Sequence, residues 1–144
     1  MKVSICSRKD AEALVREGFP KNTAVICFYS PGEEAPDYRG LPARLMTVCV
    51  RDIDIETLSW YGMTPETYFP EADAAAQFIR QAERDGLDIL WQCDYGQSRS
   101  AACCAAIREY FRKDGIRIFA DYRYYPNQLI FNKALDALNR TDGI

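Results

Sequence analysis

One short run of residues limits the possible folds of this 144-residue chain more than any other. Residues 101–107 read Ala-Ala-Cys-Cys-Ala-Ala-Ile and are apolar on every side if they are helical. A helix without a polar face is buried, so the sequence predicts a helix over 99–113 at the centre of the molecule. The apolar segment 87–91 predicts a strand that runs into Cys93, a few residues before this helix. The centre of the fold is therefore expected to be a strand, a short loop and a buried helix.

Strand-like and helix-like segments alternate along the rest of the chain. A capping pattern of Ser7 with Asp10 predicts a helix that ends near Gly18, and Asn127 is expected to cap a last helix through Leu138. Another helix is expected from Ala72 to Ala82, and strands are predicted over 2–6, 24–29, 45–50 and 116–119. Such alternation predicts a single α/β domain over residues 1–144, with a mainly parallel central sheet flanked by helices.

Composition excludes several classes of function. The formal net charge of −3 gives no reason to expect nucleic acid or an anionic membrane as a partner. The chain has no histidine, which removes Ser-His-Asp and Cys-His hydrolases and His-ligated metal sites. It also has no Cys-x-x-Cys pair, so no metal and no cofactor is expected. The first ten residues lack the apolar core of a signal peptide, which predicts a cytoplasmic protein with free thiols.

The segment between the central strand and the buried helix carries the chemistry. Of the six cysteines, Cys93 alone has an arginine six positions later, Arg99. A short loop between a strand and a helix can turn its backbone amides inward, and the helix N-terminus adds partial positive charge. These groups and the guanidinium favour a thiolate at Cys93 and can hold phosphate or another oxyanion against it. The loop residues expected to bind this anion are Asp94, Tyr95, Gly96, Gln97, Ser98 and Arg99.

The pattern Cys-x-x-Gly-x-x-Arg-Ser on a strand, loop and helix resembles the cysteine-dependent protein tyrosine phosphatase superfamily, most of all its dual-specificity branch and small bacterial relatives. The resemblance implies that Cys93 is phosphorylated, that Arg99 binds phosphate and that the Ser100 hydroxyl assists departure of the thiolate. The family usually has a histidine just before the cysteine, where this chain has Gln92. Because glutamine still donates and accepts hydrogen bonds, this departure affects the expected rate more than the expected mechanism.

The same resemblance implies an aspartic general acid on a separate loop upstream. Two candidates, Asp52 and Asp54, follow the predicted strand over 45–50. Alternation along an extended chain places both on one face, so both remain candidates. Asp52 is slightly favoured because it lies nearer to the strand end.

The leading hypothesis is a phosphatase that hydrolyses phosphotyrosine, with phosphoserine or phosphothreonine as further substrates, in a phosphorylated protein or peptide. The first alternative is a catalytically weak module that binds phosphorylated partners without turnover. The second is a rhodanese-like sulfurtransferase or an arsenate reductase, because these enzymes also place a cysteine in an anion-binding loop. Cys103 and Cys104 on the buried helix are read as core residues, with a redox role as the alternative.

Overall fold

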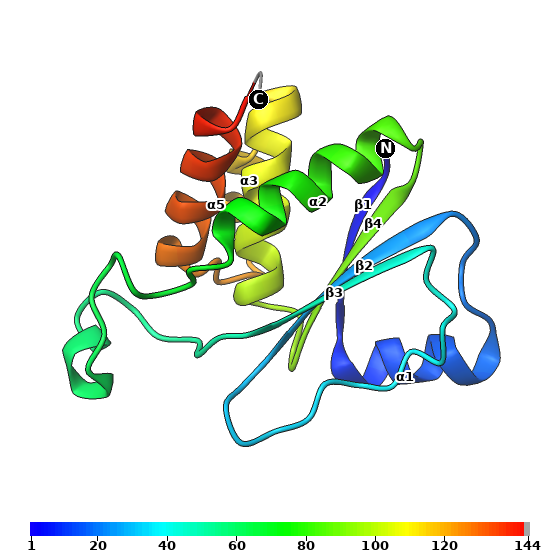
Figure 1. The fold of residues 1–144 in the computed structure, drawn as a ribbon, viewed down its shortest axis with the longest axis horizontal. Helices are drawn as coiled ribbons and strands as arrows, with labels where there is room; N and C mark the ends of the chain where they lie inside the picture. The colour runs from blue at the N-terminus through cyan, green and yellow to red at the C-terminus, as the bar shows by residue number, and fades with distance from the viewer. Residues whose placement is uncertain (143–144) are drawn as a thin grey trace.

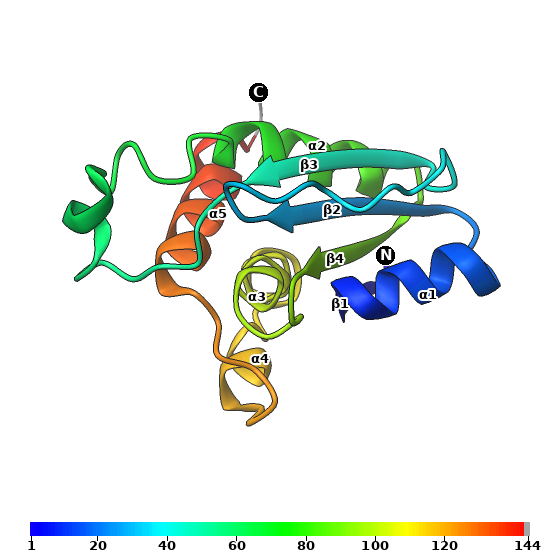
Figure 2. The same ribbon diagram turned by 90° about the horizontal axis from the view of Figure 1, so that it is seen from below.

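The computed structural model describes residues 1–142 and is built on one parallel sheet. Strands β1 (Val3–Ser7), β2 (Thr23–Tyr29), β3 (Arg44–Cys49) and β4 (Asp88–Cys93) lie in the order β1-β4-β2-β3. Helix α1 (Arg8–Glu17) covers one face, and α2 (Ala72–Arg84), α3 (Arg99–Arg112) and α5 (Gln128–Arg140) cover the other (Figures 1 and 2). This architecture confirms the predicted α/β fold with a parallel sheet.

The central strands bury both of their faces. Every residue of β2 from Thr23 to Phe28 is buried, because successive side chains pack alternately against the two helical layers. All four strands are parallel, so their carboxyl ends lie at the same end of the sheet. The segments after β2, β3 and β4 therefore meet at that end, where ligands bind in open α/β sheets.

Helix α3 is the buried central helix that its sequence predicts. All nine residues from Arg99 to Ile107 are buried. Their small side chains allow α3 to pack against both α5 and the sheet. The two predicted caps are also present: Ser7 Oγ accepts from the Asp10 amide at 3.1 Å, and Asn127 Oδ1 accepts from the Ile130 amide at 2.9 Å.

The predicted strand over residues 116–119 is wrong. These residues form a short helix, α4 (Ile116–Ala120), after the turn at Asp114 and Gly115. The amide of Ile118 donates to the Gly115 carbonyl, while Ile118 itself packs into the core and Ile116 is exposed. Two alternating apolar residues fit an amphipathic turn of helix as well as a strand, and the four-stranded sheet of residues 1–142 does not include this segment.

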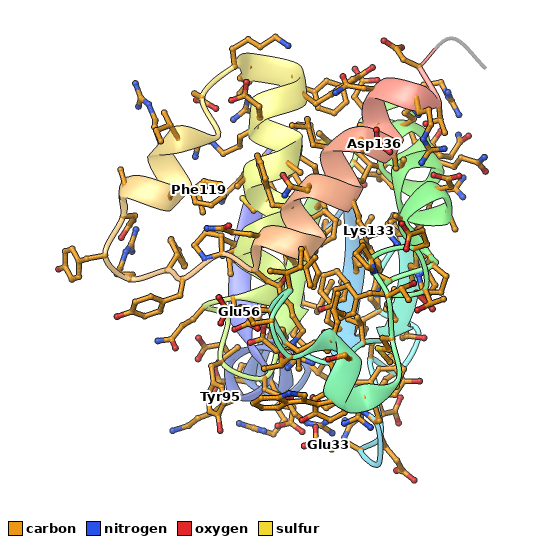
Figure 3. All side chains as sticks on the ribbon, turned by 90° about the vertical axis from the view of Figure 1, so that its left-hand side faces the viewer. Glu33, Glu56, Tyr95, Phe119, Lys133 and Asp136 are labelled. Carbon is orange, nitrogen blue, oxygen red and sulfur yellow. The ribbon has the colours of Figure 1, made fainter. Side chains whose placement is uncertain are left out.

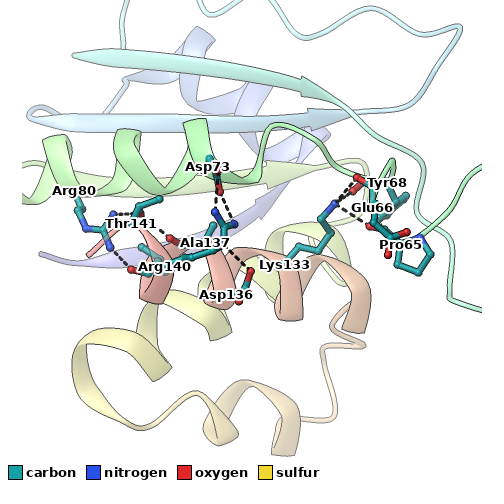
Figure 4. Close-up of polar contacts among 11 residues, drawn as sticks. Pro65, Glu66, Tyr68, Asp73, Arg80, Lys133, Asp136, Ala137, Arg140 and Thr141 are labelled. Carbon is teal, nitrogen blue, oxygen red and sulfur yellow. Dashed lines mark hydrogen bonds and ion pairs between the residues drawn. The ribbon is translucent and has the colours of Figure 1, made fainter. Parts of the chain in front are cut away.

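Helix α5 holds the segment between β3 and α2 in place. The ammonium group of Lys133 donates to the Pro65 carbonyl at 2.9 Å and also to the Tyr68 carbonyl (Figure 4). At the far end of α5, Arg140 is paired with Asp73 of α2 at 2.7 Å. Residues 50–69, called the arm below, project from the body and carry the 3-10 helix η1 (Leu58–Tyr61) at their tip (Figure 1).

Candidate active site

The loop over residues 93–99 joins β4 to α3, with Cys93 as the last residue of the strand and Arg99 as the first of the helix. Neighbouring segments hold its carbonyl groups. The Asp94 carbonyl accepts from the Arg8 amide at 3.1 Å, and the Gln97 carbonyl accepts from the Tyr125 amide at 2.7 Å. The Ser98 carbonyl accepts from the Asn127 amide at 3.2 Å.

These bonds decide where the amides of the loop point. In a trans peptide the carbonyl of one residue and the N–H of the next point in opposite directions, and the described chain has no cis peptide bond. Because the carbonyls of Asp94, Gln97 and Ser98 are held by neighbours, the following amides, of Tyr95, Ser98 and Arg99, are directed away from those neighbours. This arrangement supports the predicted anion-binding nest.

Gly96 allows the loop to lie directly on the junction of β1 and α1. Its φ of +69° is in the left-handed region. A Cβ built there would stand 2.8 Å from the Cys6 carbonyl carbon and 2.9 Å from the Ser7 nitrogen, both of them backbone atoms. Two independent constraints, conformation and space, therefore require glycine at this position.

Arg99 is fixed by the ends of three strands and is only 4% exposed. Its Nη1 donates to Ser30 Oγ, just after β2, and to the Val50 carbonyl, just after β3, both at 2.9 Å. Its Nη2 is paired with Asp94 Oδ2 at 3.1 Å. A guanidinium held on three sides needs little reorganisation when it receives an anion.

Among the buried side-chain atoms without a hydrogen-bond partner within residues 1–142, two lie in the first turn of α3: Arg99 Nε and Ser100 Oγ. Both are buried, and a buried donor without a partner costs free energy unless a ligand satisfies it. A tetrahedral oxyanion seated in the loop would supply acceptors. Arg99, which lines the cavity described below, therefore fits a phosphate group.

The structure separates the two candidate acids. Asp52 Oδ1 accepts from Ser98 Oγ at 2.7 Å and from Asn127 Nδ2 at 2.9 Å, so its carboxyl group is tied to the loop. Asp54 Oδ1 instead accepts from the amides of Glu56 and Thr57, both at 3.0 Å, which is a local turn cap within the arm. Of these two residues, only Asp52 lines the same cavity as Cys93.

A cavity of about 240 Å³ opens above the sulfur, and its lining brings these groups together: Asp52, Cys93, Tyr95, Gln97, Ser98, Arg99 and Tyr125. The rings of Tyr95 and Tyr125 are 81% and 71% exposed, so they stand at its rim. Cys93 itself is 2% exposed. A reacting group must therefore enter the cavity to reach the sulfur.

Gln92 lies on the opposite face of β4 from Cys93 and is completely buried. Its Oε1 accepts from the Tyr38 hydroxyl at 2.8 Å. The strand register places Cys6 and Cys27 on either side of it, and burial raises the pKa of both thiols to about 12. Gln92 is thus held in the core by one hydrogen bond to the loop after β2, while its Nε2 has no partner within residues 1–142.

Sequence reasoning did not identify Ser30 and Val50 as site residues, and it assigned Asn127 only a capping role. Asn127 uses Oδ1 to cap α5 and Nδ2 to hold Asp52. A polar residue directly after a buried parallel strand is a signal that could have pointed to Ser30. The Val50 contact uses a backbone carbonyl, and every residue type has one, so the sequence gives no signal for it. Cys103 and Cys104 are buried core residues, and burial raises the pKa of both thiols.

Within residues 1–142, no helix is both long enough and apolar enough to cross a membrane.

No protein-family model and no curated protein sequence matches the chain. Solved structures do. Human DUSP28 matches with a TM-score of 0.62 at 19% identity, over 96% of this chain and 92% of that one. The human tyrosine phosphatase-like serine/threonine/tyrosine-interacting protein matches with a TM-score of 0.59 at 17% identity, over 91% of this chain and 83% of that one. PTPMT1 in complex with PI(5)P matches with a TM-score of 0.58 at 12% identity, over 96% of this chain and 91% of that one. At these identities the likeness establishes the fold.

Proposed function

Because the chain has the fold of the cysteine-dependent protein tyrosine phosphatases, we propose that it hydrolyses phosphate monoesters through a cysteinyl-phosphate intermediate. One observation carries the proposal: a single cavity is lined by the Cys93 thiol, the Arg99 guanidinium and the Asp52 carboxyl group. These are the nucleophile, the phosphate-binding group and the general acid that such a reaction requires.

In the first step the Cys93 thiolate attacks phosphorus and the bond from phosphorus to the ester oxygen breaks. The loop amides and Arg99 Nε receive the equatorial oxygens of the phosphoryl group. The departing oxygen takes a proton from Asp52. Because Ser98 and Asn127 both donate to Oδ1, the proton is assigned to Oδ2 of that carboxyl group.

In the second step water attacks phosphorus, and the Asp52 carboxylate now accepts a proton from that water. The bond between sulfur and phosphorus breaks, which releases inorganic phosphate and restores the thiolate. The Ser100 hydroxyl, buried and without a partner in the described chain, is free to donate to the departing sulfur. The acid of the first step is therefore the base of the second.

Phosphotyrosine is the substrate that the cavity suits best. With Cys93 2% exposed, the phosphorus atom must enter while the peptide backbone stays outside. The phenyl ring of phosphotyrosine sets the phosphate far from the peptide backbone and can lie between Tyr95 and Tyr125 at the rim. A phosphoserine side chain is shorter and would draw its own backbone into the cavity.

The test is pre-steady-state hydrolysis of an aryl phosphate. A burst of phenol equal to the enzyme concentration, with a phosphoryl group found on Cys93 after acid quench, is expected for the wild-type protein. Cys93→Ser should lose both the burst and the turnover. Full turnover in that variant would overturn the proposal. Matched peptides carrying phosphotyrosine or phosphoserine would then decide the substrate class.

A second function, binding of phosphorylated partners without turnover, is favoured by Gln92, which stands where the phosphatases that the loop resembles usually have a histidine. One contact would lower the affinity of such a binding site. The Asp94 carboxylate occupies Nη2 of Arg99 at 3.1 Å, where it competes with a phosphate oxygen. If this function holds, the wild-type protein binds a phosphotyrosyl peptide but releases no phosphate over long incubation, and Asp94→Asn tightens the binding.

A further inference from the structure

A second and larger cavity, called the groove below, adjoins the catalytic one. Its volume is about 720 Å³, within the usual range for ligand sites. It shares Asp52, Ser98 and Tyr125 with the cavity above Cys93. Whatever extends beyond a phosphorylated side chain in the active site therefore meets the groove.

The groove lies between the arm and the start of α5. One wall comes from residues 53–61 and the other from residues 125–132. Both the base of the arm and the helix are fixed: Asn127 Nδ2 donates to the Ile53 carbonyl at 2.9 Å, and Leu129 packs into the core. The groove is thus part of the folded protein rather than a gap between loose segments.

The lining of the groove has one sign of charge. It contains Asp52, Asp54 and Glu56 but no lysine or arginine. The first two carboxyl groups accept hydrogen bonds inside the protein, whereas Glu56 is exposed and accepts no side-chain hydrogen bond within the described residues. Glu56 and Tyr95 both lie toward the end of the molecule where the carboxyl ends of the strands open (Figure 3).

Aromatic rings complete the groove. Trp60, at the tip of the arm, is 79% exposed, an unusual position for an indole ring. Its neighbour Tyr61 already carries a guanidinium: the Arg51 side chain lies over this ring at 4.4 Å from the centroid. Trp60 offers a similar face to a cation supplied from outside.

We propose that the groove binds the residues flanking a phosphorylated tyrosine and selects substrates with a lysine or arginine close to that tyrosine. This inference rests on the proposed phosphatase function. A lysine or arginine can lay its aliphatic stem on the Trp60 ring while its charged group meets Glu56. An acidic flanking residue, or the further phosphates of an inositol phosphate, would meet carboxylates instead.

The experiment compares three phosphotyrosyl peptides that differ only in the residues flanking the phosphotyrosine, which are lysine, alanine or glutamate. We expect kcat/KM to fall in that order, with about a tenfold difference between lysine and glutamate at low ionic strength. The difference should shrink as salt is raised, because exposed charges are screened. An aryl phosphate without flanking residues is the reference substrate.

Two variants sharpen the test without touching the catalytic cavity. Glu56→Lys should reverse the order of the lysine and glutamate peptides, and Trp60→Ala should reduce the advantage of the lysine peptide. Both should leave kcat/KM for the aryl phosphate unchanged, which also shows that the variants fold.

The outcomes separate the two proposals. Equal kcat/KM for the three peptides with normal turnover of the aryl phosphate would overturn the groove assignment alone, as would faster turnover of an inositol phosphate than of any peptide. Absence of aryl phosphate turnover would instead overturn the phosphatase function. In that case fluorescence anisotropy of the same peptides decides about the groove: tighter binding of the lysine peptide supports it, and equal binding overturns it.

Discussion

The loop over residues 93–99 and the arm meet at the same cavity but are built in opposite ways. The loop over 93–99 is packed between β1, β4 and α3, with Cys93 and Arg99 almost fully buried. The arm is held at its base by Tyr68, which donates to the Arg51 carbonyl, while Trp60 at its tip is exposed. The anion must be met by groups already in place, because preorganised donors cost no reorganisation during the reaction. The part of a substrate outside the cavity does not need such preorganised groups, so the arm that would contact it can be more exposed.

The largest effect is expected from replacing Asp52, and it tests whether this residue, rather than Asp54, acts together with the loop over 93–99. Asp52→Asn should lower kcat/KM for phenyl phosphate by about 100-fold or more, because the leaving phenolate then receives no proton in the first step. The fall should be smaller for p-nitrophenyl phosphate, whose leaving group is a weaker base. Asp54→Asn is the matched control and should stay close to wild type, since its Oδ1 still caps the turn. Equal losses in the two variants would contradict the assignment.

A pair of glycines tests the packing of the two regions next. Gly96 and Gly62 have nearly the same φ, +69° and +68°, but a Cβ at Gly62 meets nothing within 4 Å. Gly96→Ala should therefore displace the loop and lower kcat/KM for an aryl phosphate by about 100-fold. Gly62→Ala should cost only about 1 kcal/mol of stability from its backbone strain and leave that activity intact. Kinetics and thermal unfolding measure both, and an unaffected Gly96→Ala enzyme would show that the close approach is not required.

A smaller effect is expected from the link between the two regions. Asn127→Ser keeps an oxygen that can cap α5 but removes the Nδ2 group that donates to Asp52. We expect kcat/KM, which reports the first step, to fall about tenfold for phenyl phosphate, which needs a proton, with almost no change for an ester whose leaving group is a weak base. The midpoint of thermal unfolding should fall modestly, because Nδ2 also donates to the Ile53 carbonyl and this bond is lost as well. A uniform loss for both substrates would indicate a structural defect instead of a misplaced acid.

The smallest effect is expected at Cys6 and Cys27, whose thiols should not react with an alkylating reagent. Burial raises the pKa of Cys6 and Cys27 to about 12, so both stay protonated at pH 7.5. In a Cys49→Ser background, which removes an exposed thiol, iodoacetamide should label Cys93 and leave these two unlabelled in peptide mass spectra. Inorganic phosphate should slow the labelling. Equal rates at Cys6 and Cys93 would remove the distinction between core and site thiols.

Local signals predicted most of the fold. The capping pair of Ser7 and Asp10, the buried strand over 24–29 and the apolar helix after the loop depend on residues close together in the chain, so periodicity and caps identify them. The strand predicted over 116–119 was wrong because this segment gives only a weak local signal. Four residues carry too little periodicity to separate a strand from a turn of helix, and the packing of Ile118 into the core decided it.

The order of residues 93–100 by itself predicted the candidate nucleophile, the expected anion-binding loop and the arginine that ends it, because all of these are neighbours in the chain and share one strand, turn and helix. The choice of Asp52 over Asp54, the anchoring of Arg99 by Ser30 and Val50, and the groove beside the cavity were decided only by the tertiary structure. These depend on contacts between residues 46 to 75 positions apart, such as Asp52 with Ser98 and with Asn127. Such distances along the chain are closed by the packing of the sheet and helices, which no local pattern encodes.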